Sequence, residues 1–487
     1  MSLLLQSLFP RLLGPGAYGD FNFLTDTAIK FIDFIDSGTS TAFYVKLSSQ
    51  PDNRPLLRFY WILLIVQIAL YLLINGTLIV TGVYTIIWPN QEAFLIFLSA
   101  LYGIGILTTR IGQYTLDANK LTVISERFII MQLVFSCLLF GIIYQIYGAV
   151  KLNFFFQVHI LLYIILFIGF SIIIKIKTGT FIPRERVGPG DKKILGKYFI
   201  NYSVPLFFYT LISFVSSLGE RWLLQTFGGS IQQGFFGISF KIAGVVLIFT
   251  TAMMPLLMRD FSIFFGKAES QYIGERYSKY SRLLYSVVTV FAVCIFFNAD
   301  FIVNIIGGPE FKSAKPILMV MAFYPVHQTL GQINGTIFYA SHRVRLYTLM
   351  GMIGFLVSLL VSFFLIAPPQ YFGLNMGAMG LAIGWVVVQI LIVNVSLAVN
   401  SKYLKTSYWF LFFHQIIAFI VLFFLGKLIS FGLDHIITPQ AGLLRCIIFS
   451  TVYGIAMVSL LFSFPSLFAF RNKTEFLSLL HRPNKDI

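Results

Sequence analysis

The chain has 487 residues, of which 57% are hydrophobic and only 11% are charged, and its mean hydropathy is +0.84. A soluble protein carries about 25% charged residues, and continuous apolar runs argue against both a soluble fold and the alternating strands of a membrane barrel. A net charge of +16 is compatible with binding to nucleic acid. The placement of the basic residues along the chain indicates a different cause, as described below.

Apolar runs long enough to cross a membrane recur along the whole chain. A spanning helix needs about 20 apolar residues. Residues 1–13 resemble the end of one further helix, so either the native chain begins upstream or the first helix is partial. With that piece the sequence predicts an all-α polytopic membrane protein of about 14 transmembrane helices. The remaining predicted runs are 21–45, 58–84, 92–110, 128–149, 154–175, 198–220, 234–257, 282–303, 315–340, 345–367, 375–399, 407–430 and 443–465.

The basic residues gather on one side of this predicted topology. Of the 35 Lys and Arg residues, 26 lie in the connections after even-numbered helices or in the C-terminal tail, and six lie in the other connections. By the positive-inside rule both termini are cytoplasmic. The positive charge is therefore a topology signal, and we expect no nucleic-acid partner.

The connection 176–197 contains "PRERVGPGDKK", and its Pro, Gly and charge content is typical of a linker. It predicts four parts of the chain. These are an N-terminal six-helix bundle (1–175), a cytoplasmic basic linker (176–197), a C-terminal six-helix bundle (198–400), and two extra helices with a cytoplasmic tail (401–487).

The two halves show signs of an internal repeat. A shift of 215 residues brings "GPGAYGDFNFLTDTA" at 14–28 onto "GSIQQGFFGISFKIA" at 229–243, and it pairs Gly14 with Gly229 and Gly19 with Gly234. Each matching stretch falls at a predicted short outer turn between the first and second helix of its half. Halves that repeat after an even number of helices keep the same orientation in the membrane.

The predicted helix 21–45 carries four ionisable side chains in one sector. At 100° per residue, Asp26, Lys30, Asp33 and Asp36 fall within about 120° of the helix surface, which predicts a polar wall along an aqueous interior. Lys30 is within reach of Asp26 and Asp33 on its own helix. The carboxylates remain in excess, so we also expect a contact of Lys241, from the eighth helix, with Asp26 or Asp33.

Glu220 and Arg221 lie near the outer end of the seventh helix, before Trp222. They are consistent with an interfacial ion pair, or with binding of an anionic headgroup by Arg221, since arginine suits phosphate bidentately. No nucleophile elbow, phosphate loop or metal-binding motif is present, and the outer connections are short. We therefore predict no catalytic residues, no metal, no cofactor and no enzyme activity.

Three stretches resemble the Wzx-type polysaccharide (O-antigen or capsule repeat-unit) flippases of the multidrug/oligosaccharidyl-lipid/polysaccharide exporter superfamily. "RLLGPGAYGDFNF" at 11–23 resembles the family's turn after the first helix. The stretch 219–262 is similar to its second-half counterpart, and 301–385 to the family's later turn and its "P-x-x-G-x-x-GA" entry into the twelfth helix. The resemblance runs over nearly the whole chain.

The resemblance implies two six-helix bundles that face each other across a central cavity and rock between inward-facing and outward-facing states. It implies transport of a polyprenyl-diphosphate-linked oligosaccharide from the inner to the outer leaflet. The first, second, seventh and eighth helices would line the cavity, which here gives Arg11, Asp26, Lys30, Asp33, Asp36, Glu220, Arg221 and Lys241. Two features depart from the family pattern: the first helix is short, and the second is net acidic.

On this basis we expect a flippase for surface polysaccharide export in a bacterial or archaeal cytoplasmic (inner) membrane. Arg11, Lys30, Arg221 and Lys241 are the predicted substrate-binding residues. Asp26, Asp33, Asp36 and Glu220 are predicted to balance their charge or to carry a coupling H⁺ or Na⁺. The expected partners are a lipid-linked oligosaccharide, the lipid bilayer and other polysaccharide-assembly proteins. A cation-coupled multidrug exporter of the same fold and, less favoured, a membrane glycan polymerase are the alternatives.

Overall fold

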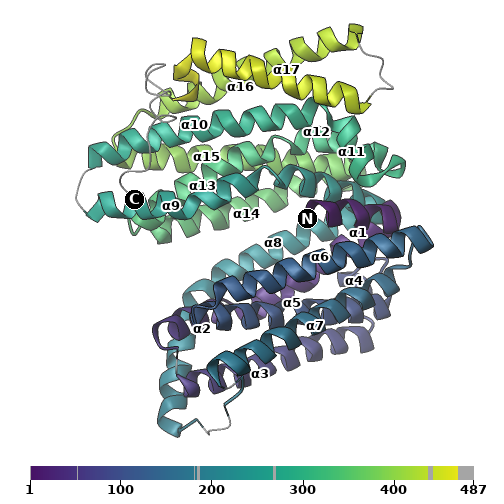
Figure 1. Cartoon of the computed structure of the whole chain (residues 1–487), viewed down its shortest axis with the longest axis vertical. Helices are drawn as coiled ribbons and strands as arrows, with labels where there is room; N and C mark the ends of the chain where they lie inside the picture. The colour runs from purple at the N-terminus through teal and green to yellow at the C-terminus, as the bar shows by residue number, and fades with distance from the viewer. Residues whose placement is uncertain are drawn as a thin grey trace. The chain divides into compact units, whose positions relative to one another are not determined.

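The computed structural model describes residues 2–51, 53–179, 181–183, 187–266, 270–436 and 442–469, with backbone only at 2–4, 205, 270 and 271. Over these residues the chain forms helices joined by turns, without a β-strand (Figure 1). The predicted all-α class is confirmed. The predicted tail after residue 469, and Arg184, Arg186 and Lys267 of the basic connections, lie outside the described residues.

The chain divides into two compact units. Unit 1 comprises Met1–Gly234 and Ile366–Gly377, and unit 2 comprises Phe235–Leu365 and Ala378–Ile487. The four-part division predicted from the sequence remains a prediction.

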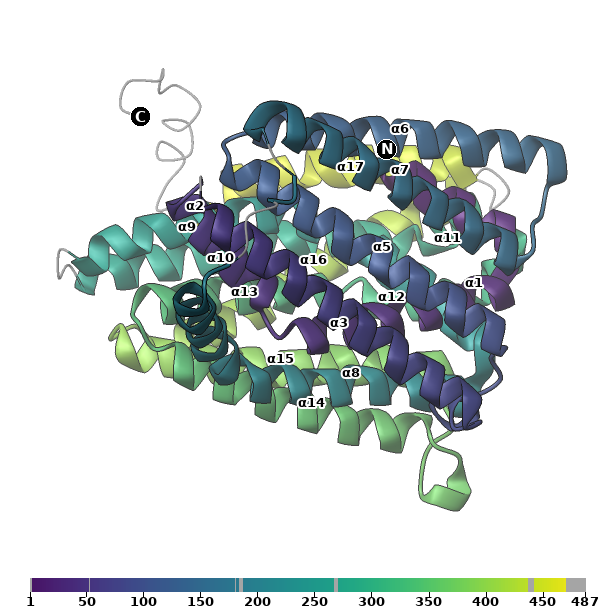
Figure 2. The ribbon, with the colours of Figure 1, turned by 90° about the horizontal axis from the view of Figure 1, so that it is seen from below.

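Unit 1 is built around α5, which packs against α1, α3 and α7. Figure 2 shows α1, α3 and α5 side by side. The helices of this unit are α1 (Ser2–Asp36), α2 (Thr39–Ser49), α3 (Arg54–Val80), α4 (Tyr84–Ile87), α5 (Ala93–Ala118), α6 (Thr122–Tyr147), α7 (Leu152–Thr178) and most of α8 (Pro189–Gly244).

Unit 2 is built around α10 and α13, which pack against each other and against α9 (Figure 1). Its buried apolar side chains form a core to which α9, α10, α13, α15, α16 and α17 contribute. Its helices after α8 are α9 (Leu247–Gly266), α10 (Ser270–Phe297), α11 (Ala299–Gly307), α12 (Lys315–Met321), α13 (Tyr324–Ala340), α14 (Val344–Ile366), α15 (Gly377–Tyr403), α16 (Tyr408–Ile436) and α17 (Gly442–Ser463).

Ten helices of the described residues are long and apolar enough to cross a membrane, and the bent pair Pro189–Val204 and Leu206–Gly244 passes as one more. The predicted runs that are not among them are 1–13, 21–45 and 315–340. The second of these crosses the junction of α1 and α2, and the third is divided between α12 and α13. The predicted run 234–257 is likewise divided between α8, which ends at Gly244, and α9, which begins at Leu247.

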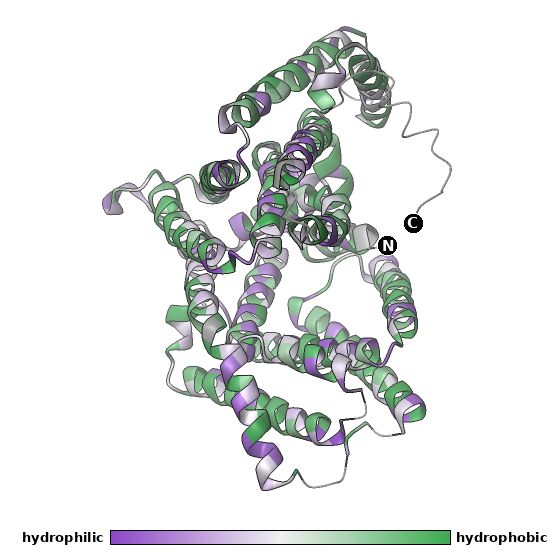
Figure 3. Cartoon of the chain, turned by 90° about the vertical axis from the view of Figure 1, so that its left-hand side faces the viewer, coloured by the Kyte–Doolittle hydropathy of each residue, from purple (hydrophilic) through white to green (hydrophobic). Residues whose placement is uncertain are grey.

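The surface of the spanning helices suits contact with lipid. Most helical residues in Figure 3 are coloured as hydrophobic. On α6 large apolar side chains such as Ile130, Met131 and Phe135 are more than half exposed. Such continuous apolar surface is rare on soluble monomers, so a multi-pass membrane protein is the architecture that this surface supports.

The two glycines that the repeat pairs adopt the same unusual backbone conformation. Gly14 has φ 70° and ψ 172°, and Gly229 has φ 74° and ψ −179°. L-residues with a side chain rarely adopt this conformation. Each glycine interrupts an otherwise helical stretch, so the predicted outer turn at each position is reduced to a single residue. Pro15 follows Gly14 at once, where proline suits the first turn of the resumed helix.

A second pair of glycines that the repeat matches, Gly19 and Gly234, lies at a reciprocal contact within unit 1. A Cβ on Gly19 would overlap the carbonyl oxygen of Ser230, and a Cβ on Gly234 would overlap that of Pro15. Pro15 and Ser230 are themselves related by the 215-residue shift. The two repeat-related segments therefore contact each other through equivalent positions. This reciprocity is independent support for the repeat inferred from sequence.

Candidate functional site

The ionisable side chains predicted on the second helix lie on α1, after the break at Gly14. We call Asp20, Asp26, Lys30, Asp33 and Asp36 the charged row. The side chains of Asp26 and Asp33 are 41% and 42% exposed, whereas Asp36 is buried. Exposed charge is costly in hydrocarbon, so the open part of the row requires water or a polar ligand.

The part of α8 before Gly229 runs antiparallel to α1. The rings of Phe34 and Phe214 stack with centroids 5.1 Å apart, and the Gln225 amide nitrogen lies 3.4 Å from the Asp20 carboxylate. Residue numbers fall along α1 as they rise along α8. This pairing brings the polar residues of α8 level with the charged row.

Asp26 forms an ion pair with Arg221 of α8. The Arg221 Nη2 atom lies 2.8 Å from the Asp26 carboxylate. The side chain of Gln233 fixes Arg221 from a second direction, because Arg221 Nη1 donates to its Oε1 over 3.2 Å and its Nε2 donates to the Arg221 carbonyl over 2.5 Å. The Arg221 side chain is only 9% exposed. Its guanidinium is therefore buried between the Asp26 carboxylate and the Gln233 side chain.

Asp33 pairs with Arg110, whose Nη1 donates to the carboxylate over 2.9 Å. The predicted run 92–110 ends at Arg110, which is therefore one of the basic residues assigned to the cytoplasmic connections. In the structure α5 continues to Ala118, because the polar residues after Arg110 lower the hydropathy without ending the helix. Arg110 was therefore missed as a site residue.

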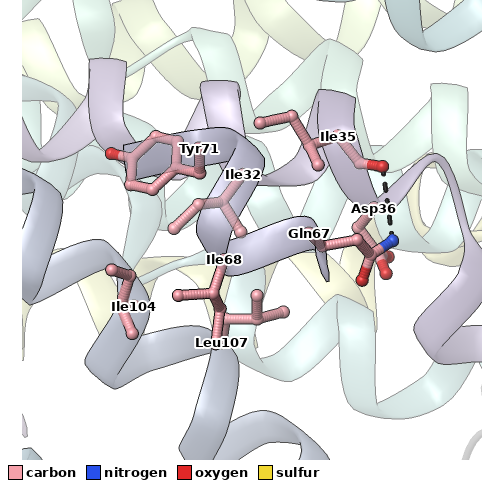
Figure 4. Close-up of a pocket in the computed structure, with 8 residues that line it drawn as sticks. All are labelled: Ile32, Ile35, Asp36, Gln67, Ile68, Tyr71, Ile104 and Leu107. Atoms are coloured by element: carbon pink, nitrogen blue, oxygen red, sulfur yellow. Dashed lines mark hydrogen bonds between the residues drawn. The ribbon is translucent and has the colours of Figure 1, made fainter. Parts of the chain in front are cut away.

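Asp36 lies at the junction of α1 and α2. Its carboxylate accepts hydrogen bonds from the Thr39 hydroxyl (2.6 Å), the Ser40 hydroxyl (2.7 Å) and the Ser40 backbone N–H (2.9 Å). A carboxylate at this position satisfies the open N–H groups of a helix start. Figure 4 shows Asp36 and Gln67 at the edge of a small pocket walled by isoleucine and leucine, with Gln67 donating to the Ile35 carbonyl.

Asp20 is a further carboxylate of the row that the sequence did not single out. It accepts hydrogen bonds from Gln91 and Ser230, each over 2.5 Å, and from Gln225 over 3.4 Å. An aspartate beside a glycine-rich stretch is an ordinary turn residue, so Asp20 could not be distinguished from other turn residues before the fold was known.

The other predicted residues are placed as follows. Within the described residues Lys30 forms no ion pair, so the predicted pairing with Asp26 or Asp33 on its own helix is not formed. Arginines from neighbouring helices take those carboxylates instead. Arg11 is exposed on α1 before Gly14, and Glu220 is buried beside Arg221. Lys241 belongs to unit 2, and its contact with Asp26 or Asp33 remains a prediction.

Arg110 and Arg221 add two cations to the charged row, while Asp20 and the buried Glu220 add two carboxylates. Five carboxylates (Asp20, Asp26, Asp33, Asp36 and Glu220) therefore lie with three cations (Lys30, Arg110 and Arg221). The acidic excess expected from the sequence remains. In the part of the chain that the structure describes, no group of three or more His, Cys, Asp and Glu side chains could hold a metal ion.

Comparison with known proteins identifies the fold. No protein-family model matches the sequence, and no curated protein matches it significantly. Among solved structures, the chain is similar to a multidrug resistance MATE family transporter of the MOP superfamily in an inward-facing conformation. That match has a TM-score of 0.62 and 14% identity, and it covers 82% of this chain and 94% of the transporter.

A second solved structure is similar over more of the chain. The lipid II flippase MurJ, in an inward closed conformation, matches with a TM-score of 0.60 and 14% identity, and the match covers 94% of this chain and 98% of the flippase. An outward-facing MATE family transporter matches with a TM-score of 0.51 and 13% identity, over 83% of this chain and 95% of that one. These neighbours are transporters and a flippase rather than enzymes. The chain thus has the fold of the MOP superfamily transporters.

Proposed function

We propose that the protein flips a polyprenyl-diphosphate-linked oligosaccharide repeat unit across the cytoplasmic membrane by alternating access, for export of a surface polysaccharide. Both termini would lie in the cytoplasm, and other polysaccharide-assembly proteins would act before and after it.

The observation that carries this proposal is the extent of the match to the lipid II flippase. It covers 94% of the chain, against 82% for the inward-facing MATE family transporter. The match that includes more of the chain favours a flippase of lipid-linked substrates over a drug exporter.

The site chemistry fits an anionic headgroup. Arg221 is fixed by Gln233 and holds the half-exposed carboxylate of Asp26, and a diphosphate offers the same kind of oxygen acceptors to a guanidinium. In the proposal Arg11, Lys30, Arg221 and Lys241 meet the diphosphate or acidic sugars. Asp26, Asp33, Asp36 and Glu220 balance those cations or carry a coupling H⁺ or Na⁺.

The test is a strain that lacks the protein. We expect lipid-linked repeat units to accumulate on the inner leaflet and the surface polysaccharide to be lost, with both restored by the unaltered gene. Normal surface polysaccharide in that strain would refute the proposal.

A cation-coupled multidrug exporter is the second candidate, because the TM-score of 0.62 to a MATE family transporter and the carboxylates of the charged row suit a cationic substrate. Altered drug susceptibility with unchanged surface polysaccharide in the same strain would favour this candidate.

A further inference from the structure

In unit 2, helix α13 has a second face that the core does not use. Its core face buries Val326, Leu330 and Ile333. Tyr324, Gln328 and Gln332 follow one another at four-residue intervals on the other side and are partly exposed. Two glutamines and a tyrosine on a helix within a membrane protein are expected to face a polar space or another helix rather than lipid.

A group of aromatic rings lies at the Tyr324 end of this face. The indole of Trp385, on α15, has its ring centroid 5.7 Å from that of Tyr324 and 5.3 Å from that of Phe240. Phe236, which is fully buried, packs edge-on against the same indole at 5.1 Å. Trp385, Tyr324 and Phe240 remain partly exposed, so the group offers aromatic surface held rigidly from behind.

Amide groups continue the face one turn further along both helices. Gln389 Nε2, on α15, donates to Gln328 Oε1 over 2.6 Å. A Cβ on the nearby Gly331 would lie 3.2 Å from Val393 Cγ2 and 3.4 Å from Gln389 Nε2, so the glycine leaves room for these two side chains of α15. This bond uses one donor and one acceptor. The Gln328 Nε2 donor and the Gln389 Oε1 acceptor have no partner within the described residues.

Gln332 also has one amide atom in a hydrogen bond and the other without a partner among the described residues. Its Nε2 atom donates to the Thr251 hydroxyl of α9 over 3.2 Å, while its Oε1 atom is buried and has no hydrogen-bond partner in the described part of the chain. A buried acceptor without a partner costs about 1–3 kcal/mol. A hydroxyl donor supplied by a ligand would remove that cost.

The charge of these segments disfavours a cationic ligand as the natural occupant. Residues 235–244 of α8 and helices α13, α14 and α15 contain no Asp or Glu, and Lys241 follows Phe240 directly. Aromatic surface beside unpaired amide donors and acceptors suits a ligand with apolar C–H faces and many hydroxyl groups, which is the chemistry of a sugar ring.

We propose that Tyr324, Trp385, Phe240, Gln328, Gln389 and Gln332 form a sugar-binding face that holds a pyranose ring of the transported oligosaccharide. The ring stacks on Trp385 and Tyr324, and its hydroxyl groups bond to the glutamine amides. This inference rests on the proposed function and assigns the glycan part of the substrate to unit 2.

The experiment measures binding of a soluble oligosaccharide to the full-length protein in detergent. The probe is the oligosaccharide released by mild acid from the lipid-linked repeat unit of the host strain, and binding is followed by calorimetry and by tryptophan fluorescence. Gln389→Leu should weaken binding about tenfold, since it removes an acceptor and disorders Gln328. Trp385→Phe should abolish the fluorescence change, whereas Trp409→Phe, at an exposed position on α16, should retain it.

Gln415→Leu is the matched control. Gln415 makes an interhelical amide bond of the same kind, from its Nε2 to Asn394 Oδ1 over 3.1 Å, at a buried position away from the sugar-binding face. It should leave affinity for the oligosaccharide unchanged. Equal weakening by Gln389→Leu and Gln415→Leu would show a structural effect and overturn the inference. So would a fluorescence change that persists in Trp385→Phe, or absence of binding by the unaltered protein.

The two proposals fail separately. If a strain lacking the protein accumulates lipid-linked repeat units but Gln389→Leu binds and flips normally, only the sugar-binding face is refuted. Normal surface polysaccharide without the protein refutes the flippase itself.

Discussion

Asp26 and Asp33 are the same residue type on the same helix, with nearly equal exposure (41% and 42%), yet their arginine partners differ. The Arg221 side chain is 9% exposed, and that of Arg110 is 28% exposed. The contribution of an ion pair to stability depends more on the burial of its charges than on its distance. The two pairs have nearly equal distances, 2.8 and 2.9 Å, but differ in the burial of the arginine. A difference between their contributions to stability therefore reports the effect of burial.

We therefore expect Asp26→Asn to destabilise the protein more than Asp33→Asn. The first removes the carboxylate that accepts from a buried guanidinium, at a cost of about 1–3 kcal/mol. The second leaves Arg110 partly solvated, at a cost below about 1 kcal/mol. Thermal unfolding of the detergent-solubilised variants measures both. Equal shifts of the midpoint, or a larger shift for Asp33→Asn, would contradict the role assigned to the buried Arg221.

Helices α1 and α8 are interrupted in the same way. Each is interrupted by a single glycine with positive φ and extended ψ, Gly14 and Gly229, and the charged row and Arg221 lie within about six turns of these breaks. The breaks set the direction in which the polar stretch of each helix continues. The site thus depends on two residues that carry no functional group.

Gly14→Ala tests this dependence. A Cβ is strained in this region of φ and ψ, and we expect a loss of about 1–3 kcal/mol in stability together with reduced transport. Gly16→Ala is the control, because Gly16 is helical and a Cβ there would have no neighbour within 4 Å. It should leave stability unchanged or raise it by up to about 1 kcal/mol. If both substitutions behaved alike, the conformation assigned to Gly14 would be wrong.

For the whole molecule, the sequence predicted what hydropathy determines and missed what depends on packing between distant helices. The all-α membrane class followed from the apolar runs alone. The pairing of Asp26 with Arg221 and of Asp33 with Arg110 did not, because 195 and 77 residues separate the partners and no periodicity within one helix reveals a neighbour. Local pairing with Lys30 was the natural prediction from one helix, and arginines on α5 and α8 replaced it. The face of α13 and α15 was likewise invisible, since isolated glutamines in apolar runs signal nothing until two helices bring them together.

The orientation of the chain in the membrane remains a prediction for the whole molecule, and it rests on the distribution of lysine and arginine. Lys120, in the turn between α5 and α6, and Gln370, in the connection between α14 and α15, are both exposed. The positive-inside rule places the first in the cytoplasm and the second outside. In a variant without Cys137, Cys294 and Cys446, a single cysteine at position 370 should react with an impermeant maleimide in intact cells. One at position 120 should react only after the membrane is opened. Labelling in the reverse order would invert the topology and place the charged row with its Asp36 end toward the outside.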